Sequence, residues 1–195
     1  VIQGNAELIK YGSVDPAEGA DSIMRRADDI ISLSESARKF EQILRTEQPK
    51  LEVTDLTDIV DTYAEDVRNT RRDVDITVDR PGKAHVQASP LVKSAVRNVI
   101  DNAIDHNDKP VAQVDIAISR SDAFVTLSVS DNGPGLPERE LQIIQGGNET
   151  PLDHSSGLGL WITHWIVTKS GGWIEHEPNE PRGSTIQLVF PRGNQ

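Results

Sequence analysis

Three short blocks of polar residues and glycines follow one another along the chain. They are residues 98–107, with asparagines at Asn98 and Asn102, then Asp131–Gly135, then Gly157–Leu160. Amide and carboxylate oxygens are ligands that suit Mg²⁺, and a glycine loop that opens a helix offers backbone N–H groups to phosphate. In this order the blocks predict a pocket for a magnesium nucleotide. Each block alone is more often a turn or a solvated surface.

The first block should lie on a helix, because apolar residues recur there at helical spacing: Val92, Ala95, Val96, Val99 and Ala103. Ser89 followed by Pro90 predicts a capping residue and the first helical position. Asn98, Asn102 and Asp105 then share one edge, beside the apolar face. One or two side-chain oxygens and the nucleotide phosphates complete the shell of Mg²⁺, and Asn102 fits that part. The alternative is that both asparagines are solvated.

The second block follows a predicted strand at 123–130, whose alternating apolar residues are Val125, Leu127 and Val129. This strand should end at Asp131, and Gly133 and Gly135 permit backbone torsions and close approaches that a β-carbon would forbid. A carboxylate fixed there can accept a hydrogen bond from an exocyclic amine such as that of adenine, a bond worth about 1.5–3 kcal/mol. The alternative is a strand-ending turn.

The third block opens a mostly apolar predicted helix, which contains Leu158, Leu160, Trp161, Trp165, Ile166 and Val167. Gly157 and Gly159 would let phosphate approach the N–H groups at the helix start. The sequence lacks the Gly-x4-Gly-Lys-Ser/Thr pattern of a P-loop, and it lacks the Gly-x-Gly-x-x-Gly fingerprint of dinucleotide-binding folds. Backbone amides rather than a P-loop lysine should therefore hold the phosphates.

Together the three blocks resemble the ATP-binding domain of the superfamily that joins DNA gyrase, the MutL repair ATPases, a heat-shock chaperone and the sensor histidine kinases. They match in order the asparagine box and two glycine boxes of the histidine kinase catalytic domain, over roughly residues 50–191. The resemblance implies ATP and Mg²⁺ as cofactors, with Asn102 as the metal ligand and Asn98 and Asn102 as catalytic residues. It implies nucleotide contacts by Asn98, Asn102, Asp105, His106, Asp131, Gly133, Gly135, Leu136, Gly157, Leu158, Gly159, Leu160 and Ser184. Asp131 would read the adenine amine, and the Ser184 hydroxyl would support the adenine site through water.

Position 98 distinguishes the members of this superfamily. The ATP-hydrolysing members and the anti-sigma-factor serine kinases carry a glutamate there, which activates the attacking water or hydroxyl, whereas histidine kinases carry asparagine. An amide is no general base near neutral pH, so Asn98 favours transfer of the γ-phosphoryl group to a histidine. His106 is shared with the anti-sigma relatives, which keeps an ATPase or serine kinase as an alternative.

Two departures from the family pattern favour a further alternative, a nucleotide-binding scaffold without transfer activity. Histidine kinases commonly have a basic residue where this chain has Asp105, so one phosphate contact should be absent. No phenylalanine lies between Phe124 and Phe190, so the Phe box of the family is not recognisable. The expected lid, near residues 145–156 with a hinge at Gly146 and Gly147, is also short.

Residues 1–48 are predicted to form a helical hairpin, with Asp15 capping the second helix. The apolar positions of that helix are Ile23, Met24, Ala27, Ile30, Ile31, Leu33, Ala37, Phe40 and Leu44. A stripe this broad predicts a four-helix bundle made by two subunits, hence a homodimer; packing onto the chain's own catalytic domain is the alternative. In histidine kinases this hairpin carries the phosphoacceptor histidine. Since none of the five histidines lies here, we expect the acceptor upstream of Val1.

The predicted fold class is α+β: a two-layer α/β sandwich with a mixed sheet at residues 49–195, preceded by the hairpin. Strands are expected near 75–79, 83–88, 111–119, 123–130, 172–177 and 184–190, with antiparallel pairing of the last ones. The chain has no cysteine and no apolar run of about 18 residues, so we expect a cytoplasmic fragment without membrane contact. This expectation leaves open whether the full-length protein is soluble or anchored in a membrane. As a histidine kinase, its partner would be a response regulator receiver domain.

The charge of the chain also bears on its partners. Its 31 acidic and 20 basic residues give a net charge of −11, which opposes binding to nucleic acid. The acidic residues are scattered through the sequence. Such a composition resembles that of proteins from salt-rich cytoplasm, as in haloarchaea, although a solvated acidic surface is the simpler explanation.

Overall fold

The structure is a computed structural model that describes residues 2–24, 27, 49–144 and 158–194. The chain divides into two compact units, Val1–Glu47 and Gln48–Gln195. In the first unit, α1 (Ile2–Lys10) is followed by a second helical stretch at residues 16–24. The Asn5 amide donates to the Ser22 hydroxyl at 2.6 Å and so joins the two helices. Asp15 Oδ1 accepts the N–H of Ala17 at 2.8 Å, which confirms the predicted cap.

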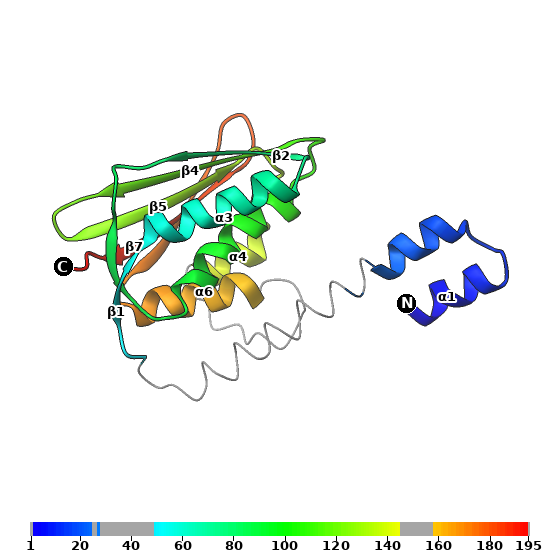
Figure 1. Ribbon diagram of the computed structural model, residues 1–195, viewed down its shortest axis with the longest axis horizontal. Coiled ribbons are helices and arrows are strands. Elements are labelled where there is room, and N and C mark those ends of the chain that lie inside the picture. Colours follow the sequence, from blue (N-terminus) through cyan, green and yellow to red (C-terminus); the bar gives the residue numbers. More distant parts are fainter. Residues whose placement is uncertain (1, 25–26, 28–48, 145–157, 195) are drawn as a thin grey trace. The chain divides into compact units, whose positions relative to one another are not determined.

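The second unit is a two-layer sandwich (Figure 1). Its elements are β1 (Glu52–Asp55), α3 (Leu56–Thr70), β2 (Val74–Asp79), β3 (His85–Ala88), α4 (Val92–Asp105), β4 (Ala112–Arg120), β5 (Phe124–Asp131), α5 (Glu138–Ile144), α6 (Leu158–Lys169), β6 (Trp173–Pro178) and β7 (Ser184–Pro191). The main sheet has the order β2-β4-β5-β7-β6. The β2–β4 pair is parallel and the other pairs are antiparallel. Helices α3, α4 and α6 cover one face of this sheet, as the predicted fold class requires.

Alternating strands and amphipathic helices build the core between these layers. Successive side chains of a strand point to opposite faces of the sheet, so β4 and β5 each bury every second residue. Fully buried apolar side chains include Ile116, Leu127, Leu188 and Phe190 from the strands, and Leu56, Ile100, Leu160 and Ile166 from the helices. In the described part of the chain, no helix is long and apolar enough to cross a membrane.

A strand that was not predicted, β1, pairs antiparallel with β3 in a separate two-stranded sheet. One local prediction was wrong. The helix that carries the asparagines begins at Val92, with Leu91 as its N-cap and without a side-chain cap bond. Ser89 is fully buried and its N–H donates to the Ser170 hydroxyl at 3.0 Å. This tertiary contact holds Ser89 and Pro90 in a turn before the helix, instead of in its first turn.

Two other predictions concern residues outside those described. One is the broad apolar stripe of the second hairpin helix, most of which lies in residues 28–48. The other is the lid near residues 145–156 with its glycine hinge. The homodimer and the short lid therefore stay predictions.

Candidate functional site

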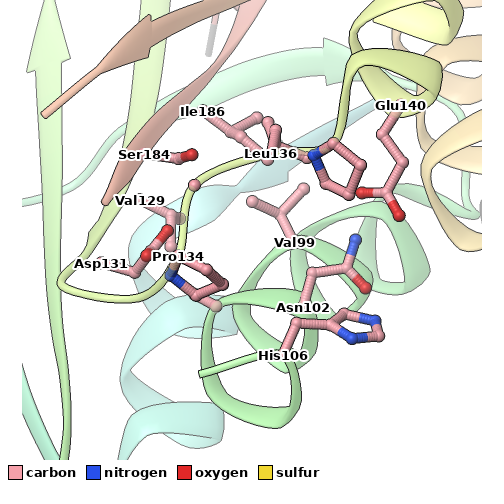
Figure 2. A pocket seen from close by; sticks show the side chains of 13 residues that line it. Val99, Asn102, His106, Val129, Asp131, Pro134, Leu136, Glu140, Ser184 and Ile186 are labelled. Carbon is pink, nitrogen blue, oxygen red and sulfur yellow. The ribbon is translucent and has the colours of Figure 1, made fainter. Parts of the chain in front are cut away.

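A pocket of about 200 Å³ opens between α4, the loop that follows β5, and the start of β7. Its lining residues are Val99, Asn102, Ala103, His106, Val129, Asp131, Pro134, Gly135, Leu136, Pro137, Glu140, Ser184 and Ile186. In Figure 2, Asp131 and Ser184 lie at one side of this pocket, whereas Asn102, His106 and Glu140 lie at the other. The pocket thus brings together residues from the first two sequence blocks and from the last strand.

Asp131 is the last residue of β5, as predicted, and its half-buried side chain faces the pocket. Its Oδ1 accepts the backbone N–H of Gly133 at 2.7 Å, which fixes the carboxylate within the turn. Burial raises the pKa of the Asp131 carboxyl, and the N–H groups of Gly133 and Ser184 and the nearby His176 oppose that shift. The result is a preorganised acceptor in a partly desolvated pocket, where a hydrogen bond to an amine gains strength.

The loop after Asp131 uses its glycines for space and for conformation. A β-carbon on Gly133 would lie 2.9 Å from Asp131 Oδ1, so any side chain there would displace the carboxylate. Gly135 has a φ of 87°, in the region that favours glycine. A β-carbon on Gly135 would lie 3.8 Å from the Ser184 hydroxyl, at the pocket wall. Gly133 therefore leaves room for the Asp131 carboxylate, and Gly135 allows the turn that lines the pocket beside Ser184.

Asn102 lies in the last turn of α4 and His106 is the C-cap residue of that helix; both side chains line the pocket (Figure 2). Within the described residues, the Asn102 side chain takes part in none of the hydrogen bonds found, so its amide oxygen is available to a ligand. Burial is partial at Asn102, whereas His106 is exposed. These two side chains offer one neutral amide oxygen and one imidazole at this end of the pocket.

A chain of amides fixes the spacing between the two sides of the pocket. The Asn107 amide, just after α4, donates to Asn132 Oδ1 at 2.8 Å. The same oxygen accepts the backbone N–H of Gln113 on β4 at 3.1 Å. Because Asn132 follows Asp131 directly, these bonds tie the end of the helix that carries Asn102 to the end of the strand that carries Asp131.

Asn98 does not line the pocket. Its Nδ2 donates to the carbonyl oxygen of Gly159 at 3.1 Å, and the Thr163 hydroxyl donates to the same oxygen at 2.9 Å. Gly159 lies in the first turn of α6, between the half-buried Leu158 and the buried Leu160. Asn98 therefore joins α4 to the start of α6, while Gly157 lies outside the described residues.

We expect Asn98→Asp to destabilise the second unit by about 1–3 kcal/mol, because a carboxylate would replace an amide donor facing a carbonyl oxygen. Urea denaturation followed by circular dichroism measures this loss. Asn102→Asp, on the same helix and without a hydrogen bond to replace, is the matched control in the absence of nucleotide. Equal losses for both variants would contradict the tethering role of Asn98.

Asp105 lies away from the pocket, although the resemblance places it among the nucleotide contacts. Its Oδ1 lies 3.1 Å from Nη1 of Arg71, and Arg71 also pairs with Asp73. These side chains are largely exposed, so the ion pair adds little to stability. Asp105 therefore does not replace the basic residue that is common in the family. Arg71 does not replace it either, because it pairs with two carboxylates outside the pocket.

Glu140 on α5 is a pocket residue that the sequence analysis missed. Its side chain lies at the same side of the pocket as Asn102 and His106 (Figure 2). Burial raises the pKa of its carboxyl, and His106 opposes the shift. A glutamate in the first turn of a helix is common for electrostatic reasons alone, so the sequence carried no specific signal for this position.

Comparison with known proteins gives a consistent family. The profile described as "Histidine kinase-, DNA gyrase B-, and HSP90-like ATPase" matches residues 87–194. The chain is 32% identical over 145 residues to the signal transduction histidine-protein kinase/phosphatase MprB of Mycobacterium sp. strain KMS, which covers 71% of this chain and 28% of that protein. It is 26% identical over 214 residues to the histidine-protein kinase ArlS of Staphylococcus haemolyticus, covering 97% of this chain and 45% of that protein.

A solved structure agrees with these relatives. The ATP binding domain of PrrB from Mycobacterium tuberculosis superposes with a TM-score of 0.58 at 25% identity, over 74% of this chain and 99% of that chain. The chain spans less than half the length of the curated relatives above. Their names refer to proteins longer than the region that matches.

Proposed function

Because the chain belongs to the family of histidine kinase-, DNA gyrase B- and HSP90-like ATPases, we propose that its pocket binds ATP with Mg²⁺ and presents the γ-phosphate to a histidine. One observation carries this proposal: Asp131 and Asn102 lie at opposite sides of the same pocket (Figure 2). The purine would lie beside Asp131, and the phosphates would extend toward Asn102. Val99, Val129 and Ile186 supply apolar walls for the base.

The donors at the Asn102 end fit magnesium. Mg²⁺ takes oxygen ligands and keeps several waters, so one amide oxygen and phosphate oxygens complete its shell. We propose Asn102 as that ligand, with Asn98 acting through its bond to Gly159. When bound, the metal neutralises charge on the transferring phosphoryl group. The chain's own contribution is to orient the base with Asp131 and to hold the first turn of α6 with Asn98.

The absence of a carboxylate at position 98 favours transfer to histidine over hydrolysis. A histidine acceptor brings its own nucleophilic nitrogen, so it requires no general base from the pocket. For the whole protein we propose a homodimer formed through the hairpin at residues 1–48, a catalytic domain at residues 49–195, and a response regulator receiver domain as the phosphoryl acceptor that follows histidine.

Asp131→Asn should lower ATP affinity about tenfold to a hundredfold. The substitution removes the charge of the acceptor, and the amide can turn its nitrogen, which is a donor, toward the adenine amine. Calorimetric titration with ATP and with purine riboside triphosphate, which lacks the amine, measures the effect. The loss should be much smaller for the analogue. Asp115→Asn, on an exposed position of β4, is the matched control. Equal losses for both nucleotides would contradict base recognition by Asp131.

Transfer of the γ-phosphoryl group to histidine is tested by incubating the full-length protein with γ-labelled ATP and Mg²⁺. Phosphohistidine is labile in acid and stable in base, so label with those properties supports the kinase. Acid-stable label would indicate a serine kinase, and phosphate release without label would indicate an ATPase. ATP binding without either product would indicate a nucleotide-binding scaffold.

A further inference from the structure

His176 stands directly behind the base end of the pocket without lining it. It lies on β6, in register with Ile186 of β7, and its Nε2 is 3.4 Å from the Ser184 hydroxyl oxygen. Ser184 is buried and lines the pocket beside Asp131. The Ser184 side chain therefore contacts the imidazole and also lines the pocket.

The orientation of the Ser184 hydroxyl decides what the pocket offers to a purine. A hydroxyl has one hydrogen to donate and two lone pairs. If the imidazole accepts that hydrogen, the pocket meets only lone pairs. If Nε2–H donates to the hydroxyl oxygen instead, the Ser184 hydrogen is free to point into the pocket.

Adenine and guanine require opposite patterns at this edge. Adenine presents its amine as a donor next to ring nitrogen N1, which is an acceptor, whereas guanine presents O6 as an acceptor next to N1–H as a donor. Asp131 supplies an acceptor for the amine. A hydroxyl that donates, directly or through one water, completes the pattern for adenine and leaves guanine with two mismatched contacts.

We infer that His176 is a positioning residue, which donates from Nε2–H to the Ser184 hydroxyl and so makes that hydroxyl a donor toward N1 of adenine. This inference rests on the proposed function and adds a residue that sets its base specificity. Burial lowers the pKa of His176, and the carboxylates of Asp131 and Glu177 oppose the shift. In the neutral ring the required form is the Nε2–H tautomer; in the protonated ring both nitrogens donate.

The surroundings of Ser184 leave His176 as the residue that controls its hydroxyl. The backbone carbonyl of Ser184 accepts from the Asn179 amide at 3.0 Å. The neighbouring Thr185 hydroxyl is also committed, because it donates to Asn179 Oδ1 at 2.7 Å. Among the described residues, the hydrogen bond of the Ser184 hydroxyl is the contact with His176.

The test compares ATP with 1-deaza-ATP, which keeps the amine but lacks the N1 acceptor. The unaltered protein should bind ATP about threefold to tenfold more tightly, the effect of one hydrogen bond. Ser184→Ala, which removes the donor, should bring this ratio close to one. His176→Phe should lower the ratio, because the hydroxyl is no longer turned toward the pocket, whereas His176→Gln should preserve it by supplying an amide donor. His164→Phe is the matched control, because His164 is half-buried on α6 outside the pocket.

A purely structural role for His176 would lower the affinity for both nucleotides without changing their ratio. The ratio of the affinities for ATP and for purine riboside triphosphate depends on Asp131. This ratio should stay unchanged in the folded His176→Phe variant. An unaltered ATP to 1-deaza-ATP ratio in His176→Phe, or no such preference in the unaltered protein, would overturn the inference. If the unaltered protein binds no ATP at all, the proposed function fails as well.

Discussion

Replacing Gly183 with alanine should lower the free energy of unfolding by about 3 kcal/mol or more and remove nucleotide binding with it. Gly183 has a φ of 116°, where a β-carbon is strained. That β-carbon would also lie 2.0 Å from the carbonyl oxygen and 2.9 Å from the carbonyl carbon of Asp131. These are backbone atoms, so no side-chain rotation relieves the contact. The end of β5 and the start of β7 would have to separate.

Gly82→Ala separates the two causes of this effect. Gly82 has a φ of 86°, yet a β-carbon there would meet nothing within 4 Å. Urea denaturation of both variants should show a small loss for Gly82→Ala, due to backbone strain alone, and a much larger one for Gly183→Ala. Similar losses in the free energy of unfolding for both variants would mean that the pairing of β5 with β7 does not require the close approach of Gly183 to Asp131.

The expected loss of binding follows from what this approach positions. The Asn179 amide donates to the carbonyl oxygens of both Asp131 and Ser184 at 3.0 Å. One side chain in the turn between β6 and β7 therefore holds the backbone of both Asp131 and Ser184. A side chain at Gly183 would move both pocket residues at once, which is why stability and nucleotide affinity should fall together.

The sequence predicted the strands that deliver the site better than the contacts that hold it. Alternation in β5 placed Asp131 at the end of a strand, because one face of that strand is buried. The last predicted strand, at 184–190, placed Ser184 at its start. The asparagine spacing likewise put Asn98 and Asn102 on one helix edge. Local periodicity sufficed at these positions.

Long-range partners could not be predicted in this way. Nothing near Asn98 in the sequence indicates that its amide reaches Gly159, and nothing near Asp105 indicates its pairing with Arg71. The start of α4 was misplaced for the same reason, since Ser89 bonds to Ser170 at the end of another helix. Tertiary contacts overrode local capping preference there.

The largest functional effect should come from Asn102→Ala. The substitution removes the proposed oxygen ligand of Mg²⁺, and it leaves no hydrogen bond broken among the described residues, so the fold should persist. Without its metal in place, the developing charge on the γ-phosphoryl group loses several kcal/mol of stabilisation. Transfer to histidine in the full-length protein should fall about a hundredfold or more.

Binding measurements separate a metal ligand from an ordinary pocket residue. For the unaltered chain, ATP should bind more tightly in magnesium than in EDTA; for Asn102→Ala the two affinities should nearly coincide, with the affinity in EDTA little changed. Asn69→Ala, an exposed asparagine on α3, is the matched control and should keep the full magnesium effect. If Asn102→Ala retains the magnesium dependence of the unaltered chain, the metal is held elsewhere, and the half-buried Glu140 carboxylate, at the same side of the pocket (Figure 2), is then the oxygen donor to substitute next.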